Sequence, residues 1–193
     1  DDDASEAFNA RIIGLLQQMS TQVGTLYLQH GNRDFLLGPE FAKAAGLTLL
    51  ADPCEIDLYG RKAIISHGDA LCTDDLAYQQ FRQMVRNPQW QAQFLSQPLP
   101  VRKAIAEDLR RKSEASKQEK AAAIMDVNAD AVASLFARFP GITDLIHGHT
   151  HRPACHTQHL DANAYRRWVL PDWYDGKWGY LHCSADGWQL QRY

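Results

Sequence analysis

Three short apolar segments, each expected to form a buried strand, run directly into polar loops that contain glycine. The segments cover residues 25–29, 62–66 and 142–146, and the loops are His30-Gly31-Asn32-Arg33-Asp34, His67-Gly68-Asp69 and His147-Gly148-His149-Thr150-His151. In α/β proteins, ligands bind beyond the carboxyl ends of strands, so these three loops are predicted to converge on one crevice. The recurrence favours an α/β fold with a site at one edge of its sheet.

Each of the three loops carries side chains that can bind a metal ion, namely Asn32, His67 and the pair His149 and His151. Glycine beside each ligand allows the backbone to turn tightly and approach an ion. His149 and His151 are two residues apart, which in an extended segment places both imidazoles on the same side. The alternatives are a chance cluster of histidines or a structural zinc site, and Asn32 by itself indicates only a turn. Recurrence at three strand ends favours a metal site.

Composition bounds the class of protein. The chain has 193 residues, 45% of them hydrophobic, which is enough for one compact domain with a core. A net charge of −3 gives no overall attraction to nucleic acid. The four cysteines form no C-x-x-C pair and are expected to be reduced, as in a cytoplasmic protein. No apolar run approaches the length of a membrane span.

The remaining pattern predicts both helices and strands. A helix is expected over residues 8–19 with Ser5 as its N-cap, and a second between Pro39 and Gly46. A hairpin is expected around Tyr59-Gly60-Arg61, helices over residues 75–139, and β structure at residues 165–169, 178–182 and 188–192. The simplest account is one α/β domain over residues 1–193, with a helical insertion at about 76–120.

The predicted insertion is basic and rich in large apolar side chains. Residues 76–120 contain nine Lys or Arg and four acidic residues, a net charge of +5, interleaved with Trp90, Phe94 and Leu95. A cationic surface with exposed aromatic residues is typical of binding to an anionic membrane interface. A helical lid that packs on the core and keeps a solvated basic face fits the same residues. From the residues alone, both interpretations stand.

The three loops resemble, in the same order, the later signature blocks of the calcineurin-like metallophosphoesterases: Gly31-Asn32, His67-Gly68-Asp69 and Gly148-His149-Thr150-His151. Much of that superfamily has His where this chain has Arg33. Four longer blocks, at residues 30–38, 67–75, 124–128 and 147–153, resemble the superfamily's lipid A pathway diphosphatases. The resemblance implies a calcineurin-like α/β sandwich, incomplete at the N-terminus, whose helical insertion forms a lid.

The resemblance also implies an activity and a set of site residues. The reaction would be cleavage of the pyrophosphate of UDP-2,3-diacylglucosamine, giving UMP and 2,3-diacylglucosamine 1-phosphate, at the cytoplasmic face of the inner membrane. Asn32, His67 and His149 would ligate one metal ion and His151 a second, and the nitrogen and oxygen ligands suit Mn²⁺. The substrate-binding residues would be Asn32, Arg33, Asp75, Tyr78, Ser113, Lys117, Lys120 and His149, with two acyl chains held by the insertion.

The family's first two signature blocks, Asp-x-His and Gly-Asp, do not occur in this chain, and Asp1-Asp2-Asp3 resembles the stretch that follows them. The chain alone is therefore expected to be inactive, to bind at most one metal ion weakly, and either to aggregate or to pair with the absent segment. Two rivals remain. One is a non-catalytic piece that binds the acyl sugar phosphate, and the other is a phosphodiesterase for soluble nucleotides, which has no use for a basic, aromatic insertion.

Overall fold

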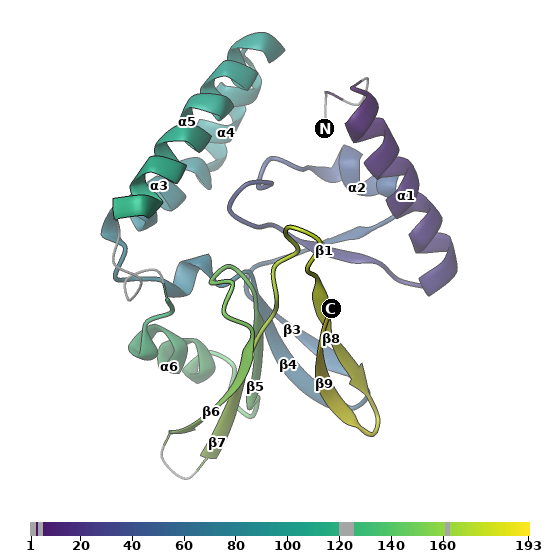
Figure 1. Ribbon diagram of the computed structural model, residues 1–193, viewed down its shortest axis with the longest axis vertical. Coiled ribbons are helices and arrows are strands. Elements are labelled where there is room, and N and C mark those ends of the chain that lie inside the picture. The colour runs from purple at the N-terminus through teal and green to yellow at the C-terminus, as the bar shows by residue number, and fades with distance from the viewer. Residues whose placement is uncertain (1–2, 4–5, 120–125, 161–162) are drawn as a thin grey trace. The chain divides into compact units, whose positions relative to one another are not determined.

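The computed structural model describes residues 3, 6–119, 126–160 and 163–193, which form a mixed α/β structure (Figure 1). The chain divides into two compact units, Asp1–Leu49 with Asp75–Met125 and Leu50–Asp74 with Asp126–Tyr193. The α/β class predicted from the sequence is confirmed. The single domain with an inserted lid stays a prediction.

The first unit begins with helix α1 (Ala7–Val23), strand β1 (Tyr27–Gln29), helix α2 (Pro39–Ala45) and strand β2 (Thr48–Leu50), whose last residue already belongs to the second unit. Strands β1 and β2 form a two-stranded sheet. Glu6 is the N-cap of α1, because its carboxylate accepts a hydrogen bond from the Asn9 amide at 3.0 Å. Ser5, the N-cap predicted from the sequence, lies outside the described residues. Gly46 ends α2 as predicted, in the left-handed conformation (φ +68°).

Three helices follow in the same unit: α3 (Leu76–Val85), α4 (Pro88–Leu95) and α5 (Leu99–Glu119). They occupy the segment that the sequence predicted to be helical. Asn87 separates α3 from α4, because its side chain accepts hydrogen bonds from the Gln89 and Trp90 amides, and Pro88 fits the first helical position. Among the helices that the structure describes, none has both the length and the apolar character needed to cross a bilayer.

The second unit is built on a five-stranded sheet in the order β3-β4-β5-β7-β6. Its strands are β3 (Cys54–Leu58), β4 (Arg61–Ser66), β5 (Asp144–His147), β6 (Ala154–Leu160) and β7 (Asn163–Val169). The outer pairs β3–β4 and β6–β7 are antiparallel, whereas β4, β5 and β7 run parallel to one another. The unit also contains a short 3₁₀ helix (Asp69–Leu71), helix α6 (Ala129–Ala137) and a hairpin of β8 (Gly179–Ser184) and β9 (Gly187–Arg192).

Successive residues of the central strands enter two different cores, as the alternation of a strand requires. Ile64 and Leu145 point toward α6 and pack with its residue Phe136. Ala63 and Ile146 lie on the opposite face and pack with Trp168 of β7 and Trp188 of β9. The sheet is therefore covered by α6 on one face and by the β8–β9 hairpin on the other.

A buried carboxylate ties three strands together on the hairpin side of the sheet. The Asp144 side chain is only 1% exposed and pairs with Arg61, whose Nε lies 2.9 Å from Oδ2, and with Arg166 at 3.1 Å. It also accepts a hydrogen bond from the Trp168 indole at 3.0 Å. Burial alone would raise the pKa of Asp144, but the hydrogen bonds from Arg61 and Trp168 outweigh it and hold the pKa below its usual value.

Asp144→Asn is expected to lower the free energy of unfolding by about 3 kcal/mol at neutral pH, since it removes one partner from a mostly buried ion pair. Because the folded-state pKa is depressed, the contribution of the charge is present above the ordinary carboxyl pKa of about 4 and is lost as the pH falls through the folded value. Denaturant unfolding of both proteins from pH 7 down to pH 3 measures this. A difference that stays constant over that range would contradict the assignment.

Candidate metal centre

The carboxyl ends of β4 and β5 lie side by side, because the two strands are parallel and Ser66 is opposite His147. The chain leaves the sheet at the next residue of each strand. The Gly148 amide donates a hydrogen bond to the His67 carbonyl oxygen at 3.1 Å, which joins the two loops through their main chains. Two of the three loops predicted to converge are therefore brought together.

His67 and His149 meet at this junction. Nδ1 of His149 lies 3.2 Å from Nε2 of His67, with the ring centroids 5.0 Å apart and the planes at 68°. Both side chains are half-buried. Two nitrogen ligands, each about 2.1 Å from one ion, lie roughly 3 Å apart when they form a right angle at it. The spacing of these two nitrogens therefore fits two neighbouring coordination positions of a single ion.

The ligand set within this unit is small. Over the described ranges 3, 6–119, 126–160 and 163–193, no three His, Cys, Asp or Glu side chains gather closely enough to hold a metal ion. His67 and His149 are therefore the two imidazoles of the candidate site in this unit. Asn32, an amide, belongs to the first unit. Its joining of these two histidines stays a prediction.

The segment after His149 does not continue as a strand. β5 ends at His147, and both His149 (φ +66°) and His151 (φ +54°) adopt the left-handed conformation. The segment that was expected to be extended is therefore a turn, and the alternation rule, which applies only to extended backbone, does not hold for His149 and His151. His151 is exposed and lies beside Asp172, with Nδ1 3.3 Å from Oδ2.

A third histidine, His147, lies under both loops and is fully buried. Burial lowers the pKa of His147 to about 4, although its hydrogen bond to the Gly148 carbonyl acts in the opposite direction. The ring is therefore neutral near pH 7. A Cβ atom on Gly68 would lie 2.8 Å from Nδ1 of His147, so the glycine in His67-Gly68-Asp69 is needed for packing as well as for its φ of +106°.

In the first unit, the loop after β1 is closed by hydrogen bonds of its own. The Gly31 amide donates to the Asp34 carboxylate at 2.5 Å, and Nε2 of His30 donates to the Leu37 carbonyl at 2.7 Å. Arg86, which follows α3, donates to the Gly31 carbonyl at 2.9 Å. The loop that presents Asn32 and Arg33 is thus fixed at both ends and anchored to α3.

Arg33, the predicted phosphate ligand, forms an ion pair with Glu114 of α5. The Arg33 side chain is 47% exposed and that of Glu114 is 58% exposed, so the pair lies at the surface and is easily exchanged. The guanidinium is in this way held beside α5, on which Ser113 is also exposed.

The other predicted substrate-binding residues lie on or beside the helices of the first unit. Asp75 is the N-cap of α3 and accepts a hydrogen bond from the Tyr78 amide at 3.1 Å, so it has a structural role as well. Tyr78 is half-buried, with its ring 6.5 Å from that of Phe81. Lys117 lies on α5, but its side chain is outside the described part of the structure, as is the whole of Lys120.

Sequence reasoning missed several partners of the site: His147, Arg167, Glu114, Asp172 and Arg86. One of them left a signal. Arg166 and Arg167 are adjacent within a predicted strand, so their side chains had to point to opposite faces of the sheet. Arg167 is the buried one of the two, only 7% exposed. The partners that depend on contacts between distant segments left no local pattern.

Comparison with known proteins places the chain in a family, although no protein-family model matches it. The chain is 51% identical over 175 residues to a UDP-2,3-diacylglucosamine hydrolase of Aromatoleum aromaticum, covering 91% of this chain and 71% of the relative. It is 46% identical to the protein of that name from Stenotrophomonas maltophilia, over 98% of this chain and 78% of the relative. The corresponding protein of Cellvibrio japonicus is 47% identical, over 100% and 79%.

Identity at this level over most of both chains shows common descent. The chain is a member of the UDP-2,3-diacylglucosamine hydrolase family.

Proposed function

We propose that this protein hydrolyses the pyrophosphate bond of UDP-2,3-diacylglucosamine, giving UMP and 2,3-diacylglucosamine 1-phosphate in lipid A biosynthesis. The observation that carries the proposal is the name shared by relatives that are 46–51% identical over nearly the whole chain. The paired imidazoles of His67 and His149 at the ends of two parallel strands support it, because pyrophosphate hydrolysis requires a site that binds cations and phosphate.

His67 and His149, together with the Asn32 side-chain oxygen, would hold one divalent cation, and His151 would belong to a second. Imidazole and amide ligands without thiolate suit Mn²⁺, and the four cysteines lie elsewhere in the sequence. Bound ions would neutralise phosphate oxygens and lower the pKa of a water molecule. The protein's own contribution is to present the ligand nitrogens at a fixed spacing.

Arg33 is proposed to bind a phosphate of the substrate. Its guanidinium is exposed and already paired with a carboxylate, Glu114, and phosphate would take that partner's place. A planar guanidinium can donate two parallel hydrogen bonds to phosphate oxygens, which an ammonium group cannot do. Arg33 thus orients the pyrophosphate on the loop that also presents Asn32.

Arg33→Lys is expected to lower kcat/KM by about 10- to 100-fold, because the charge remains but the fork of donors is lost. Steady-state kinetics on the acylated substrate measures this. Arg11→Lys, at an exposed position of α1, is the matched control and should leave kcat/KM unchanged. If Arg33→Lys equals the parent protein in both kcat and KM, Arg33 does not bind the phosphate.

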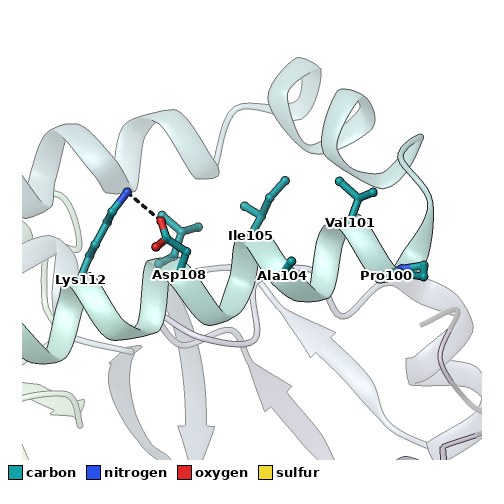
Figure 2. Close-up of a pocket in the computed structure, with 7 residues that line it drawn as sticks. Pro100, Val101, Ala104, Ile105, Asp108 and Lys112 are labelled. Carbon is teal, nitrogen blue, oxygen red and sulfur yellow. Dashed lines mark ion pairs between the residues drawn. The ribbon is translucent and has the colours of Figure 1, made fainter.

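The acyl chains are proposed to lie against α5. Figure 2 shows Val101 and Ile105 projecting from the same side of this helix, on an open groove of about 720 Å³. Pro100, Ala104 and Leu109 complete its apolar lining, and the ion pair between Asp108 and Lys112 (2.7 Å) lies at its end. Arg110 and Arg111, two further exposed cations of α5, suit anionic lipid headgroups, so we also propose peripheral contact with the inner membrane.

One assay tests the proposed reaction against a phosphodiesterase for soluble nucleotides. The intact purified protein is incubated with Mn²⁺ and either UDP-2,3-diacylglucosamine or UDP-N-acetylglucosamine, and UMP release is measured. UMP is expected from the acylated substrate only, and excess chelator should abolish it. Equal cleavage of both substrates, or full activity in chelator, would reject the proposal.

A further inference from the structure

Arg167 of β7 and His147 of β5 form a buried pair. Both side chains lie on the face of the sheet that packs against α6. Arg167 is 7% exposed and His147 is not exposed at all. Nη1 of Arg167 lies 3.0 Å from Nε2 of His147. Burial of a guanidinium costs free energy, so a contact of this kind calls for an explanation.

The pair determines which nitrogen of His147 carries the proton. A guanidinium has only donors, so Nε2 must accept with its lone pair. In a neutral imidazole the hydrogen then resides on Nδ1. Nδ1 lies 2.9 Å from the Gly148 carbonyl oxygen, to which it donates. Two consecutive hydrogen bonds therefore connect Arg167 through His147 to the Gly148 carbonyl oxygen.

The Gly148 peptide is the junction of the two loops. Its carbonyl also accepts the Thr150 amide at 2.8 Å, which closes the turn that contains His149. Its amide donates to the His67 carbonyl at 3.1 Å. A change in the direction of the Gly148 carbonyl would therefore move His149 relative to His67.

We propose that Arg167 is a positioning residue, which holds His147 in the tautomer with hydrogen on Nδ1 and so fixes the Gly148–Thr150 turn that keeps His149 beside His67. The importance of this for catalysis rests on the proposed function. Without the donor from Arg167, the other tautomer becomes accessible. Its Nδ1 lone pair would face the lone pairs of the Gly148 carbonyl at 2.9 Å, and the turn would have to shift to relieve the repulsion.

The test is made first on metal-free protein labelled with ¹⁵N-histidine. Long-range ¹H–¹⁵N spectra distinguish the two neutral tautomers, and a His147→Gln variant assigns the signal. The parent protein is expected to show the Nδ1–H form. Arg167→Met should shift His147 to the Nε2–H form or to a mixture of both, and Arg167→Lys, which retains a cationic donor, should restore the Nδ1–H form.

Mn²⁺ binding, measured by calorimetry, is the second readout. Arg167→Met is expected to weaken Mn²⁺ binding at least tenfold, and Arg167→Lys to stay within threefold of the parent. Arg166→Met is the matched control, because Arg166 is adjacent in the strand but faces Asp144 on the other side of the sheet. It should change neither the tautomer nor the Mn²⁺ affinity.

An unchanged Nδ1–H signal in Arg167→Met, or a changed tautomer with parental Mn²⁺ affinity, overturns the proposal. If Arg167→Met does not fold, the Arg167→Lys variant is used to test the proposal. Loss of the Nδ1–H form in this variant with unchanged Mn²⁺ affinity would likewise overturn the proposal. A parent protein that shows the Nδ1–H tautomer but neither binds Mn²⁺ nor cleaves the substrate would reject the proposed function while leaving the assignment of the tautomer intact.

Discussion

Alanine at His67 or His149 is expected to reduce turnover of UDP-2,3-diacylglucosamine by roughly 10³-fold or more, equivalent to about 4 kcal/mol of transition-state stabilisation. The reason is geometric. The two imidazole nitrogens are 3.2 Å apart, a spacing that lets them share one ion, and removal of either ring breaks this pair. The effect should appear in kcat, with a parallel loss of Mn²⁺ by elemental analysis.

His159→Ala is the matched control, since His159 is an exposed histidine on β6. It should retain parental turnover and metal content. Turnover close to that of the parent in both His67→Ala and His149→Ala would contradict the metal-site assignment. Loss of turnover with full metal retention would assign the histidines to the substrate instead.

Shortening one acyl chain of the substrate by four carbons is expected to weaken binding by about 10²-fold. Each buried methylene contributes roughly 0.8 kcal/mol, which is about fourfold in affinity. The apolar side of α5, with Val101, Ile105 and Leu109, is the surface proposed to bury these carbons. The measurement is the KM of substrates with a series of acyl-chain lengths at fixed detergent concentration. UMP, which has no acyl chain, serves as the reference ligand.

Variants of α5 separate this surface from the rest of the helix. Ile105→Asn should flatten the dependence on chain length, whereas Ala106→Asn, at the exposed neighbouring position, should leave it unchanged. A flat dependence in the parent protein would return α3–α5 to the interpretation as a helical lid with a solvated basic face.

Much of the second unit could be predicted because its signals are local. Alternating apolar residues marked β3, β4, β7 and the final hairpin, and Tyr59 and Gly60, both with positive φ, form the turn that the sequence indicated. β6 was missed because Ala154–Leu160 is polar and lies at the edge of the sheet, where pairing with β7 rather than burial holds it. Strands could therefore be predicted from their own apolar pattern, except for β6, which is a strand because it pairs with β7.

The candidate site was predicted only in part, for a different reason. The proximity of His67 and His149 follows from sequence, because both lie in loops after neighbouring parallel strands, and the ends of such strands share one edge. The direction of His151 could not be predicted from sequence. The left-handed turn at His149 depends on the hydrogen bond from the Gly148 amide to the His67 carbonyl, and these two residues are about 80 positions apart in the chain. Likewise, no local rule pairs Arg33 with Glu114.

The division of β4 and β5 between two cores has a consequence for insertions and deletions. Exchange of one apolar side chain for another, at Ile64 or Leu145 for example, disturbs one core and leaves the other in place. Removal of a single residue from β5 would instead turn every following side chain to the opposite face, placing His147 on the hairpin side and away from Arg167. The number of residues in each strand therefore determines which core a side chain enters. It also determines where the loops that carry His67 and His149 begin.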